Sequence, residues 1–125
     1  MPEENYKELI INIKKDITKT QYKIMRNANT ELVNLYFRLG KIISENVKYG
    51  NHFITILSKS LKLDFSNLNG FSERNLWRMK AFYEEYKEFS IVPQPVAQLP
   101  WSHNILLIEK IKDKKIREIY IKAIL

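Results

Sequence analysis

Cysteine is absent from this sequence, and glycine and proline are scarce, with three and four residues in 125. The lack of cysteine excludes a disulfide scaffold, a cysteine-ligated zinc site, a thiol nucleophile and an iron–sulfur cluster. So few glycines and prolines argue against an all-β or disordered chain. Hydrophobic residues make up 45% and aromatic residues 12%, which is enough for one core at this length. We therefore expect residues 1–125 to form a single, mainly all-α domain.

Long apolar runs and recognisable signals are also missing. Met1 is followed by proline and two glutamates instead of a basic and then an apolar segment. No apolar stretch approaches the roughly 20 residues that a membrane span requires. The chain also lacks a glycine-rich phosphate loop and a G-x-S-x-G nucleophile motif. We therefore expect a cytoplasmic chain with no membrane contact and no small-molecule substrate.

The charge has one dominant sign, +7 at pH 7 with a sequence pI near 9.5. The excess is spread over both halves instead of forming a basic tail. A domain of this charge is suited to a polyanion, because each phosphate that it neutralises releases condensed counterions. A lysine- and isoleucine-rich composition also arises from AT-rich coding, so charge alone does not decide between these readings.

Residues 5–48 carry a helical stripe of apolar residues. Its members are Tyr6, Ile10, Ile13, Ile17 and Ile24, with Thr20 in the one gap, followed by Ala28, Leu32, Leu35, Leu39 and Ile42. The pattern fits one long helix, or two helices that meet near residues 27–30, where Asn and Thr could cap a second start. Gly50 is the predicted stop. Because the stripe exceeds what one short core covers, it predicts a homodimer formed through these helices.

Residues 52–89 have the order of parts of a helix-turn-helix. A short helix is expected from about His52 to Leu63, with Phe53, Leu57 and Leu61 on one face, and a loop over residues 64–70 follows. Ser72 is placed to cap the next helix, and Phe71 and Leu76 have the spacing of a hydrophobic staple. The expected inner stripe of that helix is Leu76, Met79, Tyr83 and Tyr86.

Residues 90–101 are predicted to be a non-helical connector. They contain Pro93, Pro95 and Pro100, which remove backbone donors and favour extended conformations before them. Residues 102–125 predict two C-terminal helices, one capped by Ser102 and running through Lys112, the next capped by Asp113. The last helix ends on an apolar stripe without a stop signal, and we expect the polypeptide to continue beyond it.

The titratable residues suggest no catalytic site, metal site or cofactor. The densest acidic cluster, Glu84, Glu85 and Glu88, has no histidine at helical spacing and is interpreted as a solvated face. His52 and His103 lie in different segments and are interpreted as surface or hydrogen-bonded histidines. We expect the chain to be no enzyme by itself.

The predicted helix after Ser72 is the main candidate for binding nucleic acid. Its helical wheel sets Arg74 and Arg78 opposite the inner stripe, with Asn75 and Lys80 at the margin, and Ser72 at its N-terminus is a candidate for the same surface. Helix N-termini and arginines bind phosphates and guanine edges, and asparagine reads adenine. The competing interpretation is that the two arginines only solubilise the helix.

Two further groups are secondary candidates. Lys15, Lys19 and Lys23 follow one another at i+4, an arrangement that costs a few tenths of a kcal/mol per like-charged pair. The row is either a surface for a polyanion or a solvated outer face. His103 and Asn104 belong either to a structural corner or to a site that faces nucleic acid or another domain.

Two segments resemble a known family at its own spacing. They contain Phe71-Ser72, Arg74-Asn75-Leu76 and Met79, and then Gln98-Leu99-Pro100-Trp101, His103-Asn104 and Lys112-Asp113. This pattern resembles the N-terminal domain of the YhcG-type family of bacterial proteins. The resemblance implies a helical domain of helix-turn-helix or winged-helix type that precedes a nuclease domain of the PD-(D/E)XK superfamily. The metal-binding carboxylates and lysine of such a nuclease have no counterparts in these 125 residues.

Two functions remain open after the sequence has been considered. The first is a DNA-binding module that targets an attached nuclease to double-stranded DNA. The second is a protein-interaction or oligomerisation module of the same larger protein, in which the Tyr6–Ile42 stripe forms an intermolecular bundle and the basic surface is incidental.

Overall fold

The computed structural model describes residues 6–24, 28–47, 52–88, 94–113, 115–117 and 119. Within them the chain forms α1 (Lys7–Ile24), α2 (Ala28–Asn46), α3 (Phe53–Asp64), α4 (Glu73–Tyr86), α5 (Gln94–Gln98) and α6 (Trp101–Lys110). Residues 115–117 and 119 are helical as well, and no strand occurs in this part of the chain. The all-α prediction is therefore confirmed. None of the described helices combines the length and apolar character that crossing a bilayer demands.

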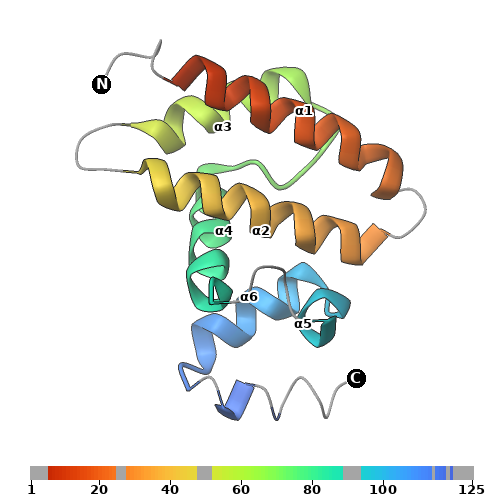
Figure 1. Ribbon diagram of the computed structural model, residues 1–125, viewed down its shortest axis with the longest axis vertical. Coiled ribbons are helices and arrows are strands. Elements are labelled where there is room, and N and C mark those ends of the chain that lie inside the picture. Colours follow the sequence, from red (N-terminus) through yellow and green to blue (C-terminus); the bar gives the residue numbers. More distant parts are fainter. Residues whose placement is uncertain are drawn as a thin grey trace.

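The first apolar stripe forms two helices, which settles the alternative that the sequence left open. α1 and α2 run antiparallel as a hairpin, and α3 lies next to α1 (Figure 1). Tyr6, Ile13 and Ile17 are buried, as the 3–4 spacing predicts. Asn27 and the predicted stop at Gly50 lie outside the described residues.

The same packing buries the centre of this stripe within a single chain, and the predicted homodimer stays a prediction. Ile13, Ile17, Leu35 and Leu39 are each at most 1% exposed, because α2 and α3 return along α1 within one chain. An intermolecular bundle needs these side chains on the surface. The stripe is longer than one short core needs because it lines the core from both sides of a hairpin.

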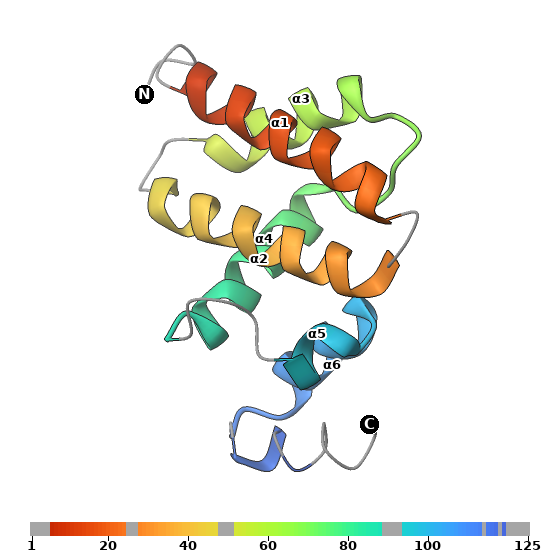
Figure 2. The same cartoon turned by 45° about the vertical axis from the view of Figure 1, so that its right-hand side comes forward.

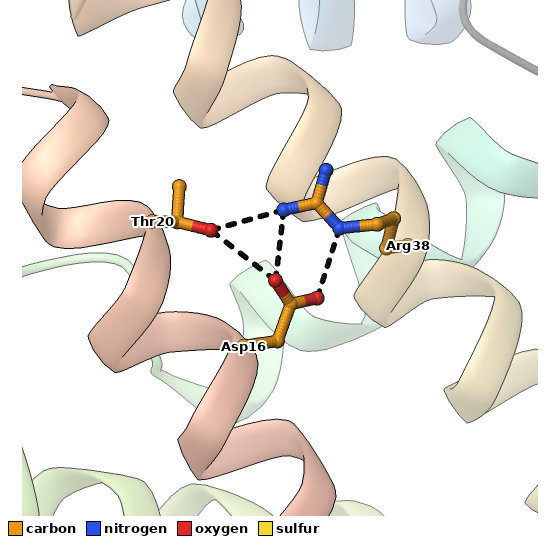
Figure 3. Close-up of polar contacts among 3 residues, drawn as sticks. All are labelled: Asp16, Thr20 and Arg38. Carbon is orange, nitrogen blue, oxygen red and sulfur yellow. Dashed lines mark hydrogen bonds and ion pairs between the residues drawn. The ribbon is translucent and has the colours of Figure 1, made fainter.

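A polar network fastens α1 to α2 beside this core (Figure 3). Arg38 on α2 donates from Nε and Nη2 to the two carboxylate oxygens of Asp16 on α1, at 2.9 and 2.8 Å. Thr20, the gap in the apolar stripe, accepts from Arg38 Nη2 at 3.0 Å and donates to Asp16 at 3.2 Å. Such a two-pronged pair is geometrically specific, so it fixes the register of the hairpin.

The second half of the fold is built on a close crossing of α4 over α2. In both views α4 runs away from the α1–α2–α3 layer towards α5 and α6 (Figures 1 and 2). A Cβ atom at Gly40 on α2 would collide with the Met79 carbonyl oxygen and lie 2.9 Å from Tyr83 Cβ. Only glycine permits the two backbones to approach this closely.

Two hydrophobic clusters flank the crossing. Leu76 and Met79 of α4 face the cluster shared with α1 and α3, whereas Phe82 and Tyr86 face a second cluster with α5 and α6. Three of the four residues predicted for the inner stripe are buried, but Tyr83 is only half-buried and Phe82 takes its place at 0% exposure. The stripe differs from the prediction because α4 is covered on two sides.

Two predictions about residues 90–112 are wrong. Gln94–Gln98 form the short helix α5 inside the predicted non-helical connector. Pro95 is compatible with it, because the first turn of a helix has no acceptor for the missing N–H group. Ser102 does not cap α6, which starts one residue earlier after Pro100 with no side-chain cap and ends at Lys110.

The chain after α6 is anchored by a buried arginine. Asp113 Oδ1 accepts from the backbone N–H groups of Lys115 and Ile116 at 2.8 and 3.3 Å, which confirms the predicted cap. Arg117 is 1% exposed, donates to Glu85 Oε2 at 2.9 Å and lies over the Tyr86 ring. The interpretation of Glu85 as part of a solvated face is therefore wrong.

We predict that Gly40→Ala lowers the free energy of unfolding by about 2 kcal/mol. Alanine gains about 1 kcal/mol of helix propensity, but overpacking at a backbone crossing costs more. Urea denaturation would measure the change, with Lys41→Ala on the exposed side of the same helix as the control. A Gly40→Ala variant as stable as the parent would contradict the close crossing.

Candidate nucleic-acid interface

The N-terminus of α4 is built as the sequence predicts. Ser72 has an extended backbone (φ −66°, ψ 155°), and its hydroxyl oxygen accepts from the Asn75 backbone N–H at 3.1 Å. Phe71 and Leu76 are buried in the same cluster, as a hydrophobic staple requires. The Ser72 hydroxyl oxygen therefore serves the helix cap.

Asn75, predicted to read a base, has both ends of its amide in hydrogen bonds within the chain. Its Nδ2 donates to the Gly70 carbonyl oxygen at 2.7 Å, and its Oδ1 accepts from Trp101 Nε1 at 2.9 Å. Gly70 has a positive φ of 107°, and a Cβ atom there would meet the hydroxyl of Tyr36. Burial raises the pKa of Tyr36 to about 12, so this hydroxyl stays neutral at the corner. Both ends of the Asn75 amide are thus committed to joining the loop, α4 and α6.

The three predicted cations of α4 differ in whether they already have an ion-pair partner. Arg78 pairs with Glu109 of α6 at 3.3 Å, and Lys80 pairs with Glu84 one turn along α4 at 3.0 Å. Arg74 is exposed and forms no ion pair within the described part of the chain. Arg74 is therefore the one predicted α4 cation that can meet a ligand without first losing a partner.

The charge of α4 is balanced overall. Its sequence contains three acidic and three basic residues. Desolvation raises the pKa of Glu84, but hydrogen bonds from Lys80 and Ser44 outweigh this effect and leave the pKa below its ordinary value. Glu84 therefore stays charged at neutral pH and offsets the basic residues nearby. The side chains of α4 therefore sum to no net charge.

His103 and Asn104 are separated by the structure. His103 is exposed, whereas Asn104 is 1% exposed and donates from Nδ2 to the carbonyl oxygens of Val96 and Leu99 at 3.0 and 3.2 Å. Asn104 thus belongs to the structural corner and does not reach the surface. His52 is exposed too, and the described residues contain no cluster of acidic and histidine side chains suited to a metal ion.

A basic groove lies instead between α1 and α3. It consists of two adjoining hollows of about 660 and 700 Å³, both lined by Ile11 and Lys14. We call this feature the α1–α3 groove. Its basic residues are Lys7, Lys14, Lys15, Lys19 and Lys59, and its apolar residues are Ile10, Ile11, Ile56, Leu63 and Phe65.

The charge around the groove is strongly one-sided. α1 contains five basic and two acidic residues, and α3 contains two basic residues and one acidic residue. Asp16 is taken by Arg38, and Asp64 pairs with Lys14 at 2.9 Å across the two helices. Among the described residues, Lys7, Lys15, Lys19 and Lys59 form no ion pair. The α1–α3 groove is therefore lined by four lysines that no carboxylate neutralises within the described part of the chain.

The sequence predicted part of this groove. Lys15 and Lys19 were secondary candidates, and both line it. Lys23 is the third lysine of that row, but its side chain lies outside the described part. Lys59 and the apolar residues of α3 were missed, because nothing in the sequence tells which face of α3 meets α1. The outward position of Lys59, opposite Leu57 and Leu61, was the one available signal.

Comparison with known proteins gives one result. A family model described as the DUF1016 N-terminal domain matches residues 12–125. That model describes an N-terminal domain, and no catalytic domain is indicated in the chain. No curated protein and no solved structure matches the chain.

We predict that Asn75→Ala destabilises the fold, whereas Arg74→Ala leaves its stability nearly unchanged. Asn75→Ala leaves the Trp101 N–H and the Gly70 carbonyl unpaired, which should lower the free energy of unfolding by about 1–3 kcal/mol. Arg74→Ala should change it by less than about 0.5 kcal/mol. Thermal or urea unfolding of the two variants tests this, and equal stabilities would restore Asn75 as a candidate ligand contact.

Proposed function

The chain belongs to the family of DUF1016 N-terminal domains, and from this premise we propose that it is a nucleic-acid-binding module that brings an attached PD-(D/E)XK-type nuclease to double-stranded DNA. The family match fits one domain of a larger protein. The observation that carries the proposal is the row of unpaired lysines along the α1–α3 groove. Since bacterial DNA is cytoplasmic, the proposal places the domain in that compartment.

The lysines suit phosphates because they are regularly spaced and have no ion-pair partner among the described residues. Lys15 and Lys19 lie one helical turn apart, about 6 Å along the axis, and Lys59 of α3 lines the adjoining hollow. A phosphate that binds a free lysine gains charge neutralisation and counterion release without breaking an existing pair. By contrast, Arg78 and Lys80 would have to leave Glu109 and Glu84.

The outward face of α4 is a second candidate surface, favoured by the exposed and unpaired Arg74 near the start of a capped helix. α3 and α4 follow the helix-turn-helix order, although the connection from Phe65 to Ser72 is longer than a tight turn. Arg78 can join Arg74, because an exposed ion pair is worth only about 0–1 kcal/mol and can be exchanged. Ser72 and Asn75 are not part of this surface as direct contacts.

We predict that the Lys15→Gln/Lys19→Gln variant binds duplex DNA more weakly and with less salt dependence. If each lysine neutralises one phosphate, the log–log salt slope should flatten by roughly two units, since each contact contributes about 0.9. Fluorescence anisotropy with a labelled duplex at several salt concentrations would measure both quantities.

The matched control is Arg74→Ala/Arg78→Ala, which removes the same charge from α4. We expect it to change the slope by less than one unit. A larger effect of the arginine pair would move the interface to α4 and favour a helix-turn-helix mode. If the parent chain shows no salt-dependent DNA binding, the proposed function is wrong.

A further inference from the structure

The α1–α3 groove exposes aliphatic side chains that phosphate binding does not explain. Leu63 on α3 is 76% exposed, and Ile11 on α1 is 43% exposed. Both line the same hollow, beside the half-buried Ile10 and Ile56. Scattered exposed leucines are ordinary, but neighbouring exposed apolar residues that form one patch often mark a docking site.

The lysines around these aliphatic side chains indicate that the partner is negatively charged. Lys7, Lys14 and Lys59 lie around the hollow that holds Leu63, and Lys15 and Lys19 continue along α1. From Lys7 to Lys19 the axis of α1 extends for about 18 Å, or three turns of helix. The groove thus offers a narrow apolar strip with cations beside it over the length of a short helix.

We infer that the α1–α3 groove binds an amphipathic helix whose apolar stripe is flanked by acidic residues. Apolar side chains at i, i+3, i+4 and i+7 would cover Leu63 and Ile11, which is the usual mode of helix-in-groove recognition. Glutamate or aspartate on either side of that stripe would pair with the lysines. If the proposed function is correct, such a helix competes with nucleic acid for the same lysines and regulates DNA binding.

Other occupants fit the groove less well. The same groove of a second copy would bring two lysine-rich surfaces together, and like charges in a symmetric contact repel. An anionic membrane surface would attract the lysines, but Ile11 and Leu63 are the only exposed aliphatic side chains among the groove residues, which is little apolar area to insert into a bilayer. Charge complementarity together with the apolar strip therefore favours the acidic helix.

The test uses the full 125-residue chain and a fluorescent peptide of about four helical turns, with leucines at i, i+3, i+4 and i+7 and glutamates on both flanks. A second peptide has the same composition with the helical periodicity scrambled. Anisotropy should show that the scrambled peptide binds at least about tenfold more weakly, because it cannot place all leucines on the groove. Vesicles with anionic lipids are tested in parallel, to detect binding to a lipid surface.

Two variants identify the site. Leu63→Asn and Ile11→Asn should each weaken peptide binding by about tenfold and leave duplex DNA binding nearly unchanged, because they alter apolar area and not charge. Leu106→Asn is the matched control, since Leu106 is 51% exposed on α6 and outside the groove. The Lys15→Gln/Lys19→Gln variant should bind both the peptide and duplex DNA more weakly. Unlabelled peptide should displace labelled DNA from the parent chain.

The outcomes separate the inference from the proposed function. Equal binding of the two peptides, or no effect of Leu63→Asn, overturns the inference while DNA binding stands. Binding of vesicles that depends on Leu63 and exceeds that of the peptide also overturns it, in favour of a lipid surface. Peptide binding without DNA binding overturns the proposed function and leaves the groove as a protein-docking site.

Discussion

The approach of α4 to α2 at Gly40 is the constraint on which the rest of the fold depends. It places α4 against the outer side of the α1–α2 hairpin, so that α2 and α4 contribute to both hydrophobic clusters. Ser58 on α3 then donates to the Phe71 carbonyl oxygen at 2.6 Å, and Thr55 donates to Glu73 at 2.8 Å. The position of α3 beside α1, and with it the groove, therefore follows from where α4 crosses α2.

The residues that carry the family resemblance hold this fold together. Trp101 donates to Asn75, and Asn104 donates to the carbonyl oxygens of α5 and the residues after it. Asn29 on α2 donates to the Leu99 carbonyl oxygen at 2.8 Å, so two asparagines secure the same turn from opposite sides. A side-chain amide that satisfies backbone carbonyls in an irregular, buried segment removes a desolvation penalty of about 1–3 kcal/mol. Asn75, Trp101 and Asn104 thus specify the connection between α4 and α6.

Local patterns in the sequence predicted the features that depend on neighbouring residues. The stripe through Ile13 and Ile17, the cap at Ser72 and the cap at Asp113 are examples. Features set by distant contacts were missed. The helix α5 exists because Val96 and Ala97 are buried under α2 and α4, despite a proline in its first turn. Asn75 was assigned to a ligand because its partner Trp101 is 26 residues away. The groove was predicted only through Lys15 and Lys19, since its other wall comes from α3.

The ion pairs at the two ends of the molecule differ in how far they are withdrawn from water. Near α4, α6 and the residues after α6, Arg78, Lys80 and Arg117 each have a carboxylate partner, and the Arg117–Glu85 pair is largely withdrawn from water. At α1 and α3 the Lys14–Asp64 pair joins the two helices, with Lys14 half-buried and Asp64 exposed. Such a pair contributes at most about 1 kcal/mol, so an incoming anion can take Lys14 at little cost. A long, flexible lysine whose carboxylate is easily displaced adapts to anions of different shape. The groove end is thus free to exchange ligands, while the arginine pairs of the opposite end stabilise the packing of α4 against α6 and the residues that follow it.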